Sequence, residues 1–330
     1  MKHFYKFNYN LTKRVVYFLA AKVRILFFFK FLRIIYSRHG TSLMVKKFVG
    51  LLDPNNIRRT SKAKIRPLKV IIKGKNGESM ALNLNEHIDF VYFMNFTFDN
   101  TCFELMKAIG RGSAKVFVDV GANIGTVSIP VSLYNPVIAF EPIYSTFLQL
   151  MENSNLNYPE NVEIVNSAIA SPAMCSRSNT IKLFQHYGNS GTTSLREDWN
   201  PGAGDCEIHT VPIVTLDDGV LPFLKGERSI ALVKIDVEGQ ELSVLEGARE
   251  IIQMHRPFFV LEWRPDRLGK ESSESLAHFF YKMSNYSVFG LRSNTKNYRI
   301  TLLPFEENKI WENILLVPKE KAGCLSDMAY

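Results

Sequence analysis

The sequence predicts an α/β fold built on a doubly wound, mostly parallel sheet. Short apolar runs recur from Val116 onward, each four or five residues long and bounded by turn signals, as in central strands that are covered on both faces. Helical stretches separate several of these runs, and strands that alternate with helices form parallel sheets. A glycine-containing turn directly follows the first run, which is typical of the ligand-binding end of such a sheet.

The predicted elements follow one another in a regular order. Strands are expected at 116–120, 137–140, 162–165, 231–235 and 258–261, and helices at 144–155 and 241–252. The second helix is expected because Val244, Leu245, Ala248, Ile251 and Ile252 share one helical face.

Two strand pairs are expected outside this alternation. Residues 68–72 and 80–84 flank a Gly-Lys-Asn-Gly turn and predict a hairpin before the sheet. Residues 181–184 and 211–214 predict a second added pair.

The charge is unevenly distributed along the chain. Residues 1–70 hold 17 Lys and Arg and a single acid, Asp53, whereas the remainder holds 23 basic and 31 acidic residues. The net charge of +8 is therefore a property of the N-terminal part. We expect a basic, apolar arm and connector at 1–66 and a catalytic domain at 67–330.

The arm contains an apolar stretch at 15–36 that Lys22, Arg24, Lys30 and Arg33 interrupt. No charge-free run approaches the ~20 residues of a membrane-spanning helix. Two interpretations remain open: a helix over residues 11–37 lying on an anionic membrane surface, or a helix packed on the protein's own body. We expect a cytoplasmic protein, peripheral at the membrane under the first interpretation. The four cysteines form no CxxC pair, so neither a zinc knuckle nor a disulfide scaffold is expected.

The stretch VDVGANIG at 118–125 predicts a ligand-binding turn. Gly121 lets the backbone turn sharply after the strand, and Gly125 lets the next helix pack close to the sheet. Glu141 follows the next predicted strand, where a carboxylate can accept hydrogen bonds from two ribose hydroxyls. A ligand that contains a nucleoside is therefore expected.

The turn also indicates which nucleoside. It lacks the middle glycine of the GxGxxG motif that nicotinamide enzymes use. Asp119 would repel a pyrophosphate and favour a cation. S-adenosylmethionine carries a sulfonium and an ammonium group and no phosphate, so we expect this cofactor, with Asp119 helping to orient its amino-acid end. A helix-capping role would explain Asp119 but not the spaced Glu141.

The motifs VDVGANIG, AFEP, NSAIAS and VKIDVEGQELSVLEGA resemble those of the FkbM-type family of S-adenosylmethionine-dependent methyltransferases. The resemblance covers roughly residues 68–318 and implies a class I, Rossmann-like methyltransferase fold. It also implies O-methylation of hydroxyls on sugars and polyketide-type natural products. It implies that the cofactor contacts Glu104, Asp119, Gly121, Asn123, Gly125, Glu141, Asn166, Ser167 and Ala168. Asp236 and Glu238 match the hallmark Asp-Val-Glu-Gly element of the family.

Methyl transfer to an alcohol needs alignment of the reactants and a base that takes the hydroxyl proton. Asp236 is expected at the carboxyl end of the fourth strand and is the favoured base. Glu238 either shares this task, binds acceptor hydroxyls, or caps the helix that begins near Gln240. His186 is a further candidate base, at the start of a polar, glycine-bearing loop that is a candidate lid.

Asp236, Glu238 and Glu262 have the hard oxygen ligands that suit Mg²⁺, but their spacing does not show that they converge, and no metal is expected. The favoured function is an O-methyltransferase that acts on a glycan or small-molecule acceptor. The alternatives are a nucleic-acid methyltransferase whose arm grips phosphate and a non-catalytic, membrane-associated binding protein of the same fold. The chain has no Asn-Pro-Pro-Tyr or Pro-Cys element for base methylation, so nucleic acid is not an expected partner.

Overall fold

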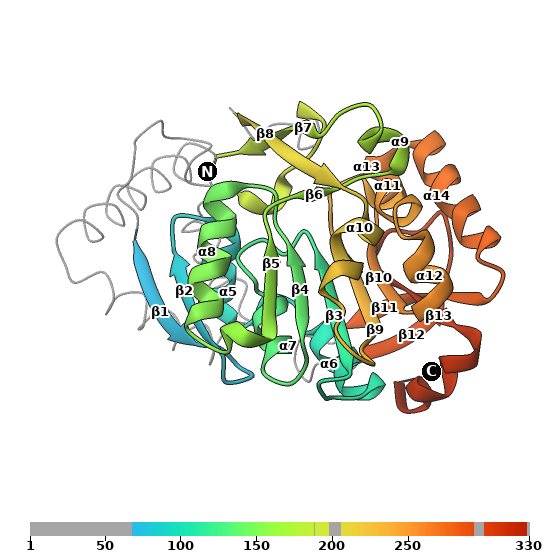
Figure 1. The fold of residues 1–330 in the computed structure, drawn as a ribbon, viewed down its shortest axis with the longest axis horizontal. Coiled ribbons are helices and arrows are strands. Elements are labelled where there is room, and N and C mark those ends of the chain that lie inside the picture. The colour runs from blue at the N-terminus through green and yellow to red at the C-terminus, as the bar shows by residue number, and fades with distance from the viewer. Residues whose placement is uncertain (1–67, 188, 198–205, 294–299, 329–330) are drawn as a thin grey trace, which may run out of the picture.

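The computed structural model describes residues 68–187, 189–197, 206–293 and 300–328. Its centre is an eight-stranded sheet with the order β12-β11-β13-β10-β9-β3-β4-β5 (Figure 1). These strands are β3 (Lys115–Val120), β4 (Val137–Phe140), β5 (Val162–Val165), β9 (Ser229–Ile235), β10 (Phe258–Trp263), β11 (Tyr286–Ser293), β12 (Ile300–Pro304) and β13 (Trp311–Pro318). The predicted α/β class and the mostly parallel central strands are confirmed.

The order of the strands defines the switch point of the sheet. β3 pairs in parallel with β4 on one side and with β9 on the other. The chain first winds outward from β3 to β5 and then returns to form β9 and β10 on the opposite side. Ligands bind at the carboxyl ends of the strands beside such a reversal, which here are the ends of β3 and β9.

Helices cover both faces of the sheet, which explains why its central strands are mostly apolar. Phe117 of β3 packs into one apolar cluster with Leu150 of a covering helix. The next residue, Val118, faces the opposite way and packs into a second cluster with Val244. The helices are α5 (His87–Asn95), α6 (Thr101–Ile109), α7 (Ser128–Ser132), α8 (Tyr144–Asn155), α9 (Pro172–Cys175), α10 (Leu216–Val220), α11 (Glu241–Glu246), α12 (Arg249–His255), α13 (Pro265–Leu268) and α14 (Lys270–Lys282).

Both predicted strand pairs outside the main sheet are present. β1 (Lys69–Lys73) and β2 (Ser79–Asn83) form the N-terminal hairpin, which lies beside α8 (Figure 1). β7 (Thr180–His186) pairs antiparallel with β8 (Cys206–Val214), and β8 pairs in parallel with the short β6 (Ala168–Ile169). The helix predicted at 11–37 lies outside the described residues, and the domain boundary at 66 stays a prediction.

The helix predicted at 241–252 is wrong in one respect, because it is two helices. The helix ends after α11 at Gly247, where a Cβ atom would lie 2.7 Å from the carbonyl oxygen of Ala170. Asp217 then caps α12, and its two carboxylate oxygens accept the N–H groups of Glu250 and Ile251 at 3.0 Å each. The apolar periodicity continues through the break, so the sequence pattern does not reveal it.

The three C-terminal strands extend the sheet beyond the predicted set. β13 pairs antiparallel with β10, and β11 and β12 continue outward from it. All four cysteines are free. None of the helices in the described ranges combines the length and the apolar character that crossing a bilayer requires.

Gly290 of β11 is predicted to be essential for packing among these strands. The Trp311 ring covers Gly290 so closely that a Cβ atom would overlap it, and Trp311 is itself buried. We expect Gly290→Ala to lower the free energy of unfolding by about 1–3 kcal/mol, the usual cost of overpacking a core. Urea unfolding followed by circular dichroism measures this, with Gly323→Ala as control because a Cβ there meets no neighbouring atom. An unchanged unfolding midpoint in Gly290→Ala would contradict the packing described.

Candidate active site

The turn after β3 brings the backbones of two neighbouring strands together. Gly121 has a φ of +82°, a left-handed conformation that favours glycine. A Cβ atom at this position would overlap the backbone carbonyl of Asp236, the residue that follows β9. Gly125 has a φ of +87°, and a Cβ there would lie 2.6 Å from the Leu150 side chain of α8. Backbone conformation and close packing therefore both require glycine at these two positions.

Glu141 lies at the end of β4 and holds the glycine turn in place. Its Oε2 accepts the backbone N–H of Asn123 at 3.0 Å, and its Oε1 accepts that of Ile143 at 2.9 Å. Burial raises the pKa of this carboxyl to about 7, although the two N–H groups favour the ionised form. Each carboxylate oxygen retains a lone pair that can accept a further hydrogen bond.

Asp119 is the penultimate residue of β3 and is fully buried. Its Oδ2 accepts the Ser128 hydroxyl at 2.6 Å, and its Oδ1 lies 3.7 Å from Nζ of Lys234. The structure thus places Asp119 behind the carboxyl end of the strands, against Lys234. Its predicted contact with the amino-acid end of a cofactor stays a prediction.

Lys234 of β9 joins Asp119 to Asp236. Its Nζ donates to Oδ2 of Asp236 at 3.0 Å, and the lysine side chain is almost completely buried. Burial alone would lower the pKa of the Lys234 ammonium, but the carboxylates of Asp236 and Asp119 more than offset this effect and raise it above its usual value. The two ion pairs therefore favour the ammonium form of Lys234.

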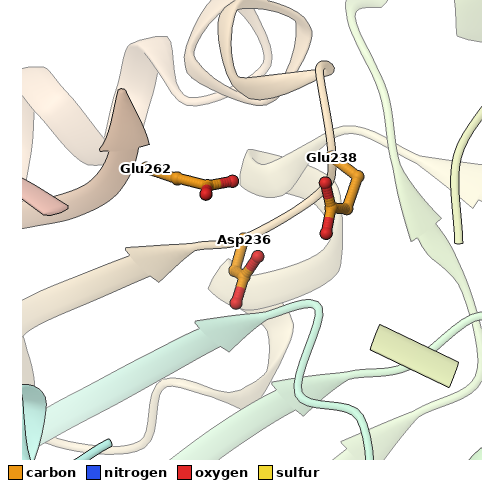
Figure 2. Close-up of side chains that lie close together, drawn as sticks. All are labelled: Asp236, Glu238 and Glu262. Carbon is orange, nitrogen blue, oxygen red and sulfur yellow. The ribbon is translucent and has the colours of Figure 1, made fainter. Parts of the chain in front are cut away.

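Three carboxylates meet at the ends of β9 and β10. Figure 2 shows Asp236 and Glu238 on the loop after β9, with Glu262 of β10 approaching them from the side. One carboxylate oxygen from each of the three lies within 4.8 Å of the other two. Glu238 reaches this position through a left-handed backbone with a φ of +48°, a conformation that is uncommon for a residue other than glycine.

Each of these carboxylates has its own basic partner. Lys234 binds Asp236, Nη1 of Arg267 lies 3.5 Å from Oε2 of Glu238, and Nη1 of Arg264 lies 3.6 Å from Oε1 of Glu262. Burial, and then the nearby Asp236, raises the pKa of Glu262 to about 7. The convergence that the sequence could not show is therefore present, and paired basic groups reduce the mutual repulsion of the three acids.

A cavity of about 510 Å³ opens between these features. This volume suits a cofactor or a drug-sized molecule. Of the residues that the sequence singled out as cofactor-binding or catalytic, the lining contains Gly121, Asn123, Glu141, Ser167, Ala168, Asp236 and Glu238. Residues from the predicted lid, Ser190, Gly191 and Thr193, also line it. The structure thus brings the predicted cofactor turn and the predicted lid to one cavity, together with the loop after β9 that carries Asp236 and Glu238, which we call the acidic loop.

Other predicted residues lie behind the lining of this cavity. Asn166 donates its side-chain amide to the carbonyls of Glu141 and Pro142 at 2.9 Å each, so it supports the end of β4. Glu104 of α6 accepts the side-chain amide of Asn100 at 3.0 Å, and Asn100 does line the cavity. Asn166 and Glu104 therefore contact residues of the cavity wall and not the space itself.

His186 differs from its predicted position. It is the last residue of β7, not a residue of the polar loop, and it is buried outside the cavity lining. Neither ring nitrogen has a hydrogen-bond partner among the described residues. The strand continues to His186 because the antiparallel pairing extends to Cys206 on β8, a partner twenty residues away that the local sequence does not reveal.

Several lining residues were not among the predicted site residues. The sequence pattern predicts Lys234 only as an ordinary strand residue. Its position two residues before Asp236 nevertheless places both residues at the same strand end. Asp99 and Asn100 enter from the start of α6, and Glu312 and Asn313 enter from β13. No motif marks these four positions, because their approach to the cavity depends on the topology of the sheet.

Comparison with protein families gives a match over the same region. The model of the methyltransferase FkbM domain matches residues 119–289, which is more than half of the chain. A comparison with curated proteins found no match.

Solved structures of methyltransferases are similar at low identity. The FkbM methyltransferase of Methylobacillus flagellatus KT is 20% identical with a TM-score of 0.37, and the match covers 62% of this chain and 43% of that chain. A Streptococcus mutans protein solved in complex with SAH is 8% identical with a TM-score of 0.36, covering 66% and 97% of the two chains. An rRNA methylase from Streptococcus thermophilus is 9% identical with a TM-score of 0.35, covering 67% and 98%.

The family match includes the glycine turn after β3, Glu141 at the end of β4 and the acidic loop after β9, which together surround the cavity. This chain belongs to the FkbM family of S-adenosylmethionine-dependent methyltransferases.

Proposed function

We propose that this chain transfers a methyl group from S-adenosylmethionine to a hydroxyl of a glycan or a small-molecule natural product. The observation that carries this proposal is the position of Asp236. Its side chain lines the cavity and is 44% exposed. Lys234 holds its Oδ2, and no described residue donates to its Oδ1. One carboxylate oxygen is therefore held in place while the other can meet an acceptor.

The residues that line the cavity suit S-adenosylmethionine. Glu141 lines it with a carboxylate whose remaining lone pairs can accept two ribose hydroxyls. Ser167, Ala168 and Ile169 supply a small, mostly apolar wall at the next strand end, which suits the adenine ring. When bound, S-adenosylmethionine supplies an electrophilic methyl group on a positively charged sulfur.

The residues of the acidic loop perform the proton transfer in this proposal. The acceptor hydroxyl donates a hydrogen bond to Asp236, which takes the proton as the hydroxyl oxygen becomes the nucleophile. Glu238 and Glu262 lie close enough to accept hydrogen bonds from neighbouring hydroxyls of the same acceptor. An acceptor with several hydroxyls would use all three carboxylates, and alignment of its reacting oxygen supplies much of the rate enhancement.

The charge of the cavity favours an acceptor without phosphate. Its described lining contains a single basic residue, Lys234, which two carboxylates already engage. The acids in the lining are Asp99, Glu141, Asp236, Glu238, Glu262 and Glu312. A phosphate group would meet like charges at close range in this space, which supports a neutral acceptor over a nucleic acid.

Asp236→Asn is predicted to abolish most of the activity without weakening cofactor binding. Loss of a general base typically costs about 10²–10⁴-fold in rate. The assay is transfer of labelled methyl from S-adenosylmethionine to a panel of methyl glycosides and hydroxylated polyketides, with affinity for S-adenosylhomocysteine measured by calorimetry. Glu250→Gln, an exposed acid on α12, is the control. Equal transfer by wild type and Asp236→Asn would remove the catalytic assignment.

Glu141 is predicted to make cofactor binding depend on pH. Its folded pKa of about 7 lies above the ordinary value of 4.5, so the carboxyl becomes protonated as pH falls below 7 and loses acceptor capacity. We expect S-adenosylhomocysteine to bind about tenfold more weakly at pH 6 than at pH 8. Glu141→Gln should bind weakly at both values, whereas Glu250→Gln should follow wild type. An affinity independent of pH in wild type would contradict this role.

The contribution of Glu141 to folding stability changes with pH in the opposite direction to its contribution to cofactor binding. Because burial raises its folded pKa, the folded protein binds more protons than the unfolded chain between about pH 4.5 and 7. The contribution of Glu141 to stability in the absence of ligand is therefore lost as pH rises through this window. Cofactor binding at pH 8 offsets that loss.

Removal of divalent cations is predicted to leave methyl transfer unchanged. Each carboxylate of the converging group already has a basic partner within 3.6 Å, and proton removal by Asp236 needs no metal. The measurement compares initial rates with EDTA and with added Mg²⁺, using S-adenosylmethionine and the panel of methyl glycosides. A rate that falls by more than about tenfold in EDTA and returns with Mg²⁺ would show that the three acids bind a catalytic cation.

A further inference from the structure

The outward side of α8 carries an unusual group of exposed apolar side chains. Tyr144, Leu148 and Met151 are spaced at i, i+4 and i+7, so they share one face of the helix, and they are 63%, 47% and 38% exposed. Leu156 and Tyr158, just past the end of the helix, are also exposed. We call these five residues the α8 face. Exposed apolar side chains that gather on one element often mark an interaction site.

Acidic residues lie on α8 and just after it, and basic residues are absent from this part of the chain. Residues 137–176 contain no Lys, Arg or His. The exposed acids near α8 are Glu152 on the helix itself and Glu160 and Glu163 just beyond it. Glu152 pairs with Lys69 of β1, and the ion pairs in the described ranges give Glu160 and Glu163 no basic partner. A partner for this surface should therefore be apolar and basic together.

The N-terminal segment of the same chain has this combined character. The stretch at 15–36 is rich in Phe, Leu, Ile and Val and carries four basic residues and no acid. Its apolar residues suit the exposed side chains of α8, and its basic residues suit the surrounding glutamates.

The described part of the chain begins beside this surface. β1 starts at Lys69, whose Nζ lies 3.4 Å from Oε2 of Glu152 on α8, and β2 of the same hairpin contacts α8 (Figure 1). A connector of about 30 residues between the apolar stretch and β1 has a typical span of about 30 Å if flexible. α8 is about 18 Å long. The stretch can therefore reach all of α8, and tethering gives it an effective concentration in the millimolar range.

We propose that the α8 face is the docking surface of the chain's own N-terminal arm, with residues 15–36 as its occupant. An anionic membrane is a poorer occupant, because the exposed glutamates would be repelled by its negative surface potential. A second copy bound through the same face would bring the two sets of glutamates together around a symmetric contact. The arm satisfies both the apolar and the acidic character of the surface.

Hydrogen exchange of the full-length chain, read by mass spectrometry, tests the proposal. The test variant carries Leu148→Glu and Met151→Glu together, which place like charge beside Glu152 and remove apolar contact. Peptides from residues 15–36 should exchange at least tenfold faster in this variant than in wild type. Met254→Glu is the matched control, because Met254 is also an exposed methionine, on α12, and it should leave the arm unchanged. Equal exchange of the arm in wild type and the double variant would overturn the proposal.

A second variant tests the electrostatic part and does not disturb any packing. Glu160 is exposed in the turn after α8, so Glu160→Lys should fold normally even if the double variant does not. It should speed exchange of residues 15–36 several-fold, and the difference from wild type should shrink at about 0.5 M salt because screening weakens exposed charge pairs. An arm whose exchange ignores both the substitution and the salt would contradict the proposal.

A membrane or a second copy of the chain as occupant of the α8 face would give different results. With vesicles of phosphatidylcholine and about one-third phosphatidylglycerol, the double variant should co-sediment more than wild type, because its arm is released. Wild-type binding to these vesicles that the α8 substitutions leave unchanged would show that the arm lies on lipid and would overturn the proposal. A wild-type dimer in light scattering that the double variant dissociates would assign the α8 face to a second copy, and would overturn it also.

Discussion

The ammonium group of Lys234, held between the carboxylates of Asp119 and Asp236, is the interaction on which the arrangement of the site depends. It joins β3 to β9, the two strands beside the switch point of the sheet. Asp119 is fully buried, so the loss of Lys234 would leave its carboxylate without a basic partner. Removing one partner from a buried ion pair typically costs about 3–5 kcal/mol. The same contact fixes Asp236, which lines the cavity. The two ion pairs of Lys234 therefore stabilise the buried Asp119 and also position Asp236, the proposed base.

The backbone around this ion pair is equally constrained. Gly121 packs against the carbonyl of Asp236, and the backbone N–H of Asp236 donates to the carbonyl of Val120 at 3.0 Å, so the glycine turn and the acidic loop are in direct contact. Asn123 and Glu238, one in each of these segments, both adopt left-handed backbone conformations. The predicted lid contacts both: the Ser190 hydroxyl donates to the side chain of Asn123, and that of Ser194 donates to the carbonyl of Glu238. Strained backbone of this kind persists where surrounding contacts over-determine it, and here those contacts join the turn, the loop and the lid.

The sequence predicted the central sheet well, because buried strands are apolar on both faces and turn residues mark their ends. The strands at 137–140 and 162–165 and the helix at 144–155 have the predicted bounds. The errors concern contacts between residues distant in sequence. The helix breaks at Gly247, which packs against the carbonyl of Ala170, and His186 belongs to a strand that pairs with β8. Likewise, the motif placed Asp119 near the site, but only the folded structure shows that Lys234 lies between Asp119 and Asp236.

Glu141 and Asp236 line one cavity, and we propose that the first holds the cofactor and the second the acceptor. A crystal structure of the full-length chain with S-adenosylhomocysteine tests this most directly. We expect both ribose hydroxyls on the Glu141 carboxylate, the adenine against Ser167 and Ala168, and the sulfur on the side of the cavity that Asp236 lines. Density for the ligand at another site, or with its ribose away from Glu141, would contradict these residue assignments.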